Sequence, residues 1–411
     1  MREENGVVPL KTPALVRANQ KEWFVNVQER ARQGEPFAIC NGDDFEEILN
    51  IMDIPFMVIN YWHALIIVKG MAQGYKDILT EKDYPEADFA VGLACTMDNN
   101  PETAPWGGLP KPSIIIGGGR TDTEIRILEL WARECGCEIW PLEYALFHGI
   151  KKPPGPRWWE RIRGHWDELI DPHNLDLRVE EEKQLIRHLE VTYGRKFSIT
   201  RLSEAMQLIN EQMDYWRKAH DLIAETVPCP VSVRDQLAMY QATWHRGTVK
   251  GRDFIKAYYE EVKERVENGI AACPNEKLRL MWMTGTPAPW ARWAEEKYGA
   301  VCVASSFSPI SINGYPREVL NNDPLRALAS RHMLLFWFTP DWVLREAKLN
   351  QCNGCVIPGP PDWYRIGGRQ NAEYFEQNGM PLIELPSHST YRDDDEVRSV
   401  LSEFIETRLL S

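Results

Sequence analysis

The feature that most constrains the fold is an alternation of short apolar runs with amphipathic helical segments, present in both end portions of the chain and absent between them. In the N-terminal portion the predicted strands are 54–60, 88–94, 113–118 and 138–143, and the predicted helices are 13–33, 43–52, 62–80 and 122–135. A strand–helix–strand rhythm of this length favours parallel pairing with right-handed crossovers. The pattern therefore predicts a parallel sheet.

The same rhythm returns in the C-terminal portion of the 411-residue chain. Its predicted strands are 278–285, 300–307, 354–360 and 381–387, and its predicted helices are 289–299, 324–337, 340–351, 367–379 and 395–410. Between the two portions, a Pro-rich break at 151–156 leads into long helices without strands, at 175–193, 199–223 and 251–269. We expect an α/β chain with two doubly wound, Rossmann- or flavodoxin-like domains, at 1–150 and 276–411, joined by a helical segment at 151–275.

Charge and composition exclude several kinds of partner. A formal net charge of −13 leaves no basic stripe for nucleic acid. No apolar run approaches the roughly 20 residues of a bilayer crossing, and the N-terminus lacks the apolar core of a secretory signal. Nine cysteines without regular spacing fit a reducing compartment. A soluble, cytoplasmic protein without disulfides is expected.

Candidate binding residues follow the predicted strands. In open parallel sheets, ligands bind beyond the carboxyl ends of the strands, where loops run into helix N-termini. The loop residues proposed to bind a substrate there are Gly118, Gly119, Arg120, Thr121, Thr286, Ser306, Arg365 and Arg369. The three arginines could bind phosphate or carboxylate groups, and solvated surface ion pairs are the alternative.

The glycine turn at 117–119 also resembles half of a dinucleotide-binding fingerprint. That fingerprint requires a third small residue where Asp122 stands, although Glu143 does end the following predicted strand. The dinucleotide site therefore remains a minor alternative. No G-x-x-x-x-G-K-[ST] motif occurs, which excludes a P-loop.

Two pairs of cysteines have spacings that metal ligands can use, Cys135 with Cys137 and Cys352 with Cys355. Both pairs lie at the amino ends of predicted strands. They are therefore expected on the edge of the sheet opposite the carboxyl ends, where ligands bind. We expect ordinary thiols there. Cys95, which follows the predicted strand 88–94, is the one cysteine expected on the ligand side.

Several segments resemble the family of 2-hydroxyacyl-CoA dehydratase and benzoyl-CoA reductase subunits. They are DDFEEILNIMDIPFMVINYWHALIIVKGMAQGYKDILTEKDYPEADFA, KPSIIIGGGRTDTEIRILELWARECGCEIWPLE, FSITRLSEAMQLINE and NGMPLIELPSHSTYRDDDEVRSVLSEFIETRL. The resemblance implies an anaerobic acyl-CoA lyase or reductase. Its subunits pair as heterodimers or heterotetramers, each holds a 4Fe-4S cluster through three cysteines, and an ATP-dependent activator supplies one electron.

Those three cysteines are missing here. The resemblance puts their positions near Ala90, at Thr121 and at Asp362 or Trp363, with Cys95 as a shifted substitute for the first. Apart from Cys95, none of the residues at these positions has a side chain that can replace a thiolate on iron. The resemblance thus implies a chain without its own cluster, whose paralogous partner subunit holds the iron–sulfur chemistry, and which contributes to the CoA-thioester cleft.

Two alternatives stay open at this point. In the first, the protein is a non-redox acyl-CoA hydratase or dehydratase whose acid and base are drawn from Glu47, His63 and Asp362. In the second, it is a non-catalytic structural subunit. Glu47 matches the family's helix glutamate and serves either as a structural group or in the active site, whereas a hydrogen-bonded structural role is the alternative for His63.

Overall fold

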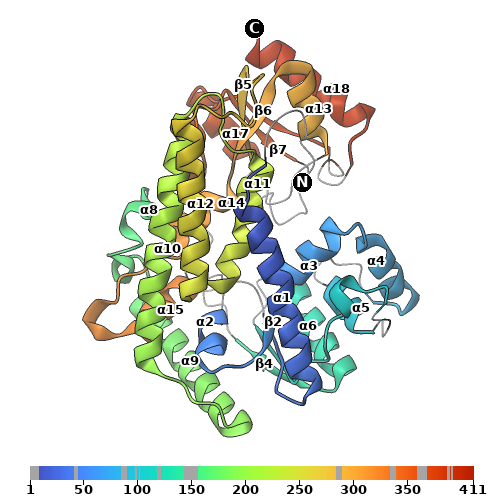
Figure 1. Ribbon diagram of the computed structural model, residues 1–411, viewed down its shortest axis with the longest axis vertical. Coiled ribbons are helices and arrows are strands. Elements are labelled where there is room, and N and C mark those ends of the chain that lie inside the picture. Colours follow the sequence, from blue (N-terminus) through green and yellow to red (C-terminus); the bar gives the residue numbers. More distant parts are fainter. Residues whose placement is uncertain are drawn as a thin grey trace.

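The computed structural model shows two parallel sheets connected by long helices (Figure 1). The structure describes residues 9–40, 45–84, 90–97, 100, 102–117, 122–142, 156–283, 289–333, 339–358, 368–386, 389 and 392–411, without the side chains of 122–124 and 368–371. The predicted fold class, two parallel α/β units separated by a helical region, is confirmed. The exact domain boundaries stay a prediction.

The first sheet has the strand order β2-β1-β3-β4, with every pair parallel. Its strands are β1 (Ala38–Cys40), β2 (Phe56–Val58), β3 (Ile114–Gly117) and β4 (Glu138–Pro141). Ile39 of β1 pairs with Met57 and with Ile115, so β1 lies at the centre of the sheet. The sequence pattern missed β1 because its three residues are too few to show a period.

Helices of the N-terminal portion surround this sheet. They are α1 (Thr12–Arg32), α2 (Glu46–Ile51), α3 (Ile59–Val68), α4 (Ala72–Glu81), α5 (Val91–Met97), the 3-10 turn η2 (Pro105–Gly107) and α6 (Asp122–Cys135). The single helix expected at 62–80 is two helices, because Gly70 between them adopts a φ of 69°. Glycine reaches this left-handed conformation at little cost, and it commonly ends a helix.

The strand predicted at 88–94 is wrong. Residues 91–97 form helix α5, whose residues Val91 to Cys95 are all buried. A Cβ on Gly92 would come within 2.6 Å of the Trp131 ring, so α5 packs directly on α6. A helix buried on all sides presents a continuous apolar run, and periodicity alone cannot distinguish such a run from a buried strand.

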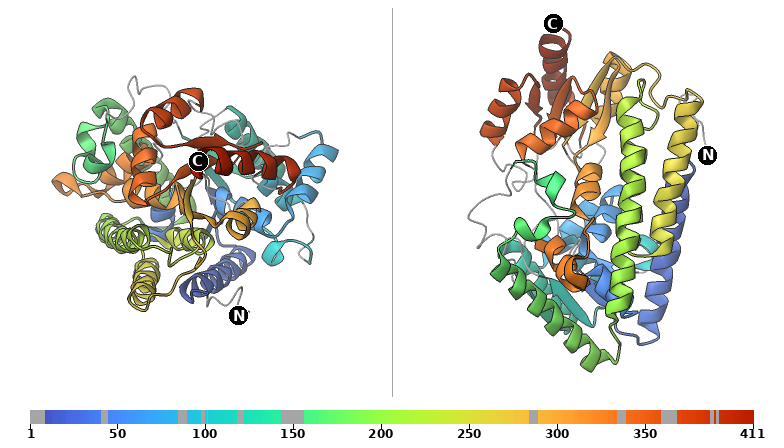
Figure 2. Two further views of the ribbon diagram at one scale, coloured as in Figure 1. Left: turned by 90° about the horizontal axis from the view of Figure 1, so that it is seen from above. Right: turned by 90° about the vertical axis from the view of Figure 1, so that its left-hand side faces the viewer.

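The middle of the chain is helical, as expected. It contains α8 (Trp158–Arg161), η3 (Trp166–Glu168), α9 (Pro172–Tyr193), α10 (Ile199–Glu225), α11 (Val233–Ala238), η4 (Met239–His245) and α12 (Val249–Glu267). Side chains of Asp171, Ser198 and Thr248 accept backbone N–H groups at the starts of α9, α10 and α12. Figure 2 shows α10 and α12 side by side along the length of the molecule.

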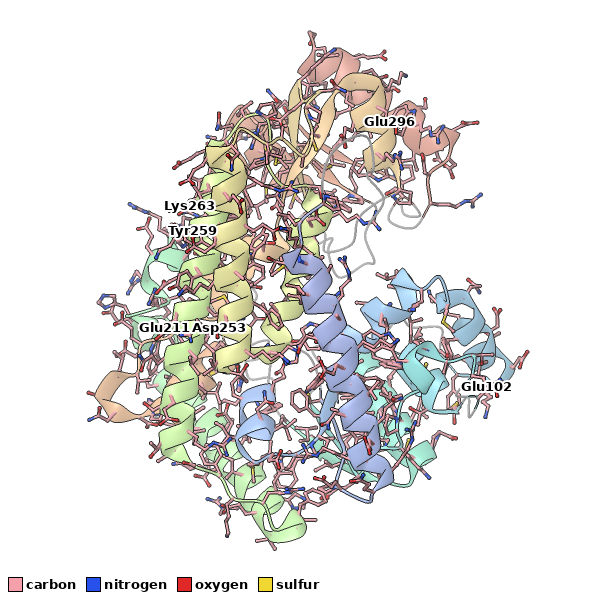
Figure 3. All side chains as sticks on the ribbon, in the orientation of Figure 1. Glu102, Glu211, Asp253, Tyr259, Lys263 and Glu296 are labelled. Carbon is pink, nitrogen blue, oxygen red and sulfur yellow. The ribbon has the colours of Figure 1, made fainter. Side chains whose placement is uncertain are left out.

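A surface ion-pair group joins these two long helices. Arg252 of α12 donates to Glu211 of α10 at 2.6 Å and to its neighbour Asp253 at 2.6 Å. Both carboxylates are labelled in Figure 3, where they lie next to each other across the two helices. Because all three side chains are partly exposed, the pairs contribute about 0–1 kcal/mol each, and the helix contact depends mainly on its buried apolar residues.

The second sheet has the order β6-β5-β7-β8 and is again parallel throughout. The elements of this portion are β5 (Leu278–Trp282), α13 (Trp290–Tyr298), β6 (Ala300–Ser305), α14 (Phe307–Gly314), η5 (Leu320–Asn322), α15 (Pro324–Met333), α16 (Pro340–Leu349), β7 (Gly354–Ile357), α17 (Gly368–Gln377), β8 (Leu382–Glu384), α18 (Asp395–Phe404) and the π-helical turn η7 (Ile405–Leu409). Leu280 and Trp282 face one core cluster and Met281 faces the other. The sheet is therefore covered on both faces, as parallel sheets require.

Close packing of α12 against the preceding turn leads to a first prediction. A Cβ on Gly251 would stand 2.1 Å from the backbone oxygen of His245, so Gly251→Ala is expected to lower the free energy of unfolding by about 1–3 kcal/mol. Gly74 is the matched control: it is an exposed helical glycine with no atom within 4 Å of an added Cβ. Gly74→Ala is expected to stabilise by about 0.5–1 kcal/mol in the same urea titration. Equal effects of the two changes would contradict the described packing.

Candidate functional site

The strand order locates one crevice in each sheet. In the first sheet the chain leaves β1 toward β2 and leaves β3 toward β4, so the connections diverge between the carboxyl ends of β1 and β3. In the second sheet they diverge between β5 and β7. Ligands of open α/β sheets bind at such topological switch points.

Most of the predicted binding residues follow the strands that flank these two points. Gly118, Gly119, Arg120 and Thr121 come directly after Gly117, the last residue of β3, but lie outside the described residues. Thr286 follows β5, and Asp362 and Arg365 follow β7, and these three residues also lie outside the described residues. Arg369 belongs to the first turn of α17, and its side chain is not among those described. Their roles stay predictions.

Ser306 comes directly after β6 and at the start of α14, although the strand was predicted to extend to residue 307. Its role in binding a substrate stays a prediction. Its backbone N–H donates to the carbonyl oxygen of Trp282, the last residue of β5, at 3.2 Å. Ser306 and Ser308 are 1% and 3% exposed, and neither hydroxyl oxygen has a hydrogen-bond partner among the described residues. A buried hydroxyl without a partner costs about 1–3 kcal/mol, so these two serines stand out among the described polar groups near this strand end.

Two aromatic pairs involve residues next to these strand ends, since Trp282 ends β5 and Phe307 follows Ser306. Trp282 and Trp290 lie 6.0 Å apart between ring centroids, and Phe307 contacts Tyr240 at 5.9 Å. Trp290 begins α13, the helix that connects β5 to β6. Trp282 and Trp290 are fully buried, so these rings belong to the core beneath the strand ends.

Glu47 is part of a buried ion-pair cluster. One carboxylate oxygen accepts from Arg246 at 2.7 Å and from Arg331 at 2.6 Å, while the other accepts from Arg331 at 2.6 Å. All three side chains are fully buried. Burial alone would raise the pKa of Glu47, but the charges of Arg246 and Arg331 outweigh it and lower the pKa to about 2. Glu47 is therefore ionised and shielded from water, and both of its carboxylate oxygens accept hydrogen bonds from arginines.

Further side chains complete this Glu47 cluster. Arg246 pairs with Glu46 at 2.6 Å and lies over the Tyr315 ring, 4.8 Å from its centroid. Tyr61 donates to Glu46 at 3.1 Å and stacks on Trp244 at 3.9 Å. The cluster joins α2 to the turn after η4 and to α15, and so connects the N-terminal sheet region with both later parts of the chain.

His63 lies near the edge of the first sheet. It is half-buried in α3, which begins one residue after β2, and β2 is an edge strand one position away from the switch point. Its use as an acid or base stays a prediction.

The placement of Cys95 must be corrected along with the strand at 88–94. Cys95 lies inside α5 and is 1% exposed, so it does not follow a strand. Ala90, the position implied for the first cluster ligand, is also buried just before α5. The cysteine that does end a strand is Cys40, the last residue of β1, which is buried next to the switch point of the first sheet. It was missed because β1 itself was missed.

Comparison with known proteins identifies the family. A family model described as 2-hydroxyglutaryl-CoA dehydratase, D-component, matches residues 46–407. The chain belongs to this D-component family. It is also similar to the (R)-2-hydroxyisocaproyl-CoA dehydratase alpha subunit of Clostridioides difficile, with 24% identity over 123 residues, which is 29% of this chain and 30% of that protein. The chain thus spans less than a third of the length of that curated relative.

The described residues of this D-component family member do not fit a 4Fe-4S cluster. Three thiolates would have to converge on one site, and no group of three or more His, Cys, Asp or Glu side chains suited to a metal occurs among them. In the second sheet, Cys302 and Cys355 lie within strands, and burial raises the pKa of the Cys302 thiol to about 12. We therefore derive no chemistry from a cluster in this chain.

No described helix of this family member combines the length and apolar character needed to cross a bilayer. The cytoplasmic location stays a prediction.

Proposed function

We propose that this chain is a subunit of a heteromeric complex that removes water from a 2-hydroxyacyl-CoA, that it lacks its own iron–sulfur cluster, and that it contributes to the CoA-thioester cleft. The observation that carries the proposal is a D-component match over residues 46–407 in a chain whose described cysteines do not converge. The relative from Clostridioides difficile is an alpha subunit, and this supports a paralogous partner. A 4Fe-4S cluster in that partner and an ATP-dependent activator belong to the same proposal.

The cleft is proposed at the switch points of the two sheets, and Ser306 and Ser308, which follow the edge strand β6 beside β5, are proposed as donors to the thioester. A CoA thioester carries phosphate and carbonyl oxygens that accept hydrogen bonds, and the start of α14 offers hydroxyl donors with the positive end of a helix dipole. The loops after β3, β5 and β7 supply the remaining candidates by their position in the chain.

The non-redox hydratase is the weaker candidate. A general base must reach the substrate proton and accept it near neutral pH. Glu47 is enclosed by two arginines, with its pKa lowered to about 2, and suits a structural role better. His63 and Asp362 remain as its candidate groups.

The proposal can be tested on the purified chain. Iron and acid-labile sulfide should be absent after anaerobic purification, and a 2-hydroxyacyl-CoA should raise the melting temperature more than inorganic phosphate does at equal concentration. Stoichiometric iron with a cluster spectrum in this chain would refute the cluster-lacking subunit. If no CoA thioester raises the melting temperature, the proposed cleft is refuted, and the non-catalytic structural subunit is the function that remains.

The two serines give a sharper prediction. Removing both hydroxyls in Ser306→Ala/Ser308→Ala should stabilise the free protein by about 1 kcal/mol, because two unpaired buried groups are lost. It should also weaken CoA-thioester binding roughly tenfold in isothermal titration, the equivalent of about 1.4 kcal/mol.

Ser311→Ala is the matched control on the same helix, since Ser311 already donates to the Phe307 carbonyl oxygen. This change should leave CoA-thioester binding unaltered. If the Ser306→Ala/Ser308→Ala variant binds the CoA thioester as tightly as wild type, α14 does not contribute to the binding site.

A further inference from the structure

The segment from Cys135 to Cys137 forms a tight helix end on the opposite edge of the first sheet from the proposed cleft. Helix α6 ends at Cys135, Gly136 adopts a φ of 59°, and β4 begins at Glu138. The N–H of Cys137 donates to the Ala132 carbonyl at 3.0 Å, and that of Gly136 donates to the Arg133 carbonyl at 3.2 Å. This pair of bonds is the Schellman motif, which fixes the two cysteines relative to each other.

The two thiols are in contact. Their side chains are joined by a hydrogen bond. Gly136 between them has the left-handed φ that mirrors an α-helical residue, and such a residue leaves the Cα atoms on either side of it about 5.4 Å apart. Disulfides span Cα separations of about 4.4–6.8 Å. A covalent bond between these sulfur atoms therefore requires little movement of the backbone.

The surroundings make the two thiols unequal. The hydrogen bond from Cys135 lowers the pKa of Cys137 and raises that of Cys135, and Lys111 nearby favours the thiolate of both. Burial and the Glu138 carboxylate oppose this effect at Cys137. A lowered pKa increases the share of Cys137 that is present as the thiolate, which is the reactive form of cysteine.

Accessibility also distinguishes this pair. All nine cysteines lie in the described residues, and Cys137 alone is not buried. The other closely spaced pair, Cys352 and Cys355, is buried, and burial raises the pKa of both thiols. Cys352 and Cys355 therefore provide an internal control for the reactivity of Cys137.

We propose that Cys135 and Cys137 form a reversible disulfide by exchange with a small-molecule disulfide such as glutathione disulfide. The Cys137 thiolate attacks one sulfur of glutathione disulfide, breaks its S–S bond and releases one glutathione thiolate. Cys135 gives up its proton to that thiolate and attacks Sγ of Cys137, which releases the second glutathione. The two cysteines lose two electrons and glutathione disulfide gains them, so the step balances.

The redox site is independent of the proposed acyl-CoA function. It lies at the end of α6, whose first residue, Asp122, follows the loop after β3. A disulfide would covalently fix the end of this helix next to the start of β4.

The test uses the full-length protein equilibrated with defined ratios of glutathione and glutathione disulfide, then alkylated and analysed by intact mass and peptide mapping. Wild type should lose two hydrogen atoms and become protected from alkylation at Cys135 and Cys137 together. Cys135→Ser should stop at a single glutathione adduct on Cys137, because the second thiol is missing. Cys137→Ser should leave Cys135 reduced.

Cys352→Ser is the control and should oxidise like wild type. Circular dichroism of each variant establishes that it is folded before oxidation is compared. Recovery of only glutathione adducts in wild type, or alkylation of Cys137 no faster than of the buried cysteines, would overturn the proposal.

Discussion

Replacing Glu47 by glutamine is expected to lower the free energy of unfolding by about 3–5 kcal/mol, because Arg246 and Arg331 would remain buried without a compensating charge. Glutamine keeps the shape of the side chain, so little of the loss would arise from packing. The measurement is urea denaturation followed by circular dichroism.

Two controls make this result interpretable. Glu296→Gln removes a charge from an exposed pair with Arg292 and should change stability by less than about 0.5 kcal/mol. Glu47→Gln combined with Arg331→Met should be less destabilised than the sum of the two single changes, since the charges are removed together. If Glu47→Gln alone does not fold, recovery of soluble protein in the double variant supports the same conclusion. A loss no larger than that of Glu296→Gln would contradict a buried ion-pair cluster.

The second large effect is a loss of stability in mild acid through His245. Burial, with a smaller contribution from Lys250, lowers the pKa of His245 to about 4. Its ring nitrogen Nε2 contacts Asn19 at 3.1 Å and Gln20 at 2.9 Å, and its ring meets Trp23 edge-on. The unfolded chain takes up this proton near pH 6.5 and the folded protein only near pH 4, so protons favour unfolding between these values.

The stability that His245 contributes is therefore complete above about pH 6.5 and is lost as the pH falls toward 4, by about 3 kcal/mol in total. His245→Gln keeps a polar group but cannot titrate, so its unfolding free energy should fall less steeply over this interval. Parallel curves for wild type and His245→Gln would exclude this histidine as the cause.

Local patterns predicted most of the fold for a physical reason. Seven of the eight described strands lie within segments predicted as strands. Five of them, β2, β3, β5, β6 and β7, are buried along most of their length, and a strand covered on both faces requires continuous apolar residues. The two failures among the strand predictions also have local causes: β1 is three residues long, and the first five residues of α5 form a continuous buried run. Ser306 directly follows the buried strand β6, at the ligand side of its sheet, and its role in binding stays a prediction.

Interactions between distant residues could not be predicted in this way. Glu47 meets Arg246, 199 residues away, and Arg331, 284 residues away. Neither arginine stands out in the sequence from those on the surface. The same limit applies to Cys40, whose position beside the switch point depends on the order of the strands.

The amino-acid sequence by itself determined the α/β class, the strandless helical middle and the set of loops that follow strands, because hydrophobic periodicity is a property of neighbouring residues. Only the tertiary structure decided which strands flank each crevice and which charges are buried together. Burial and ion pairing depend on segments brought together by packing, and the free energy of a charge changes by several kcal/mol with its surroundings.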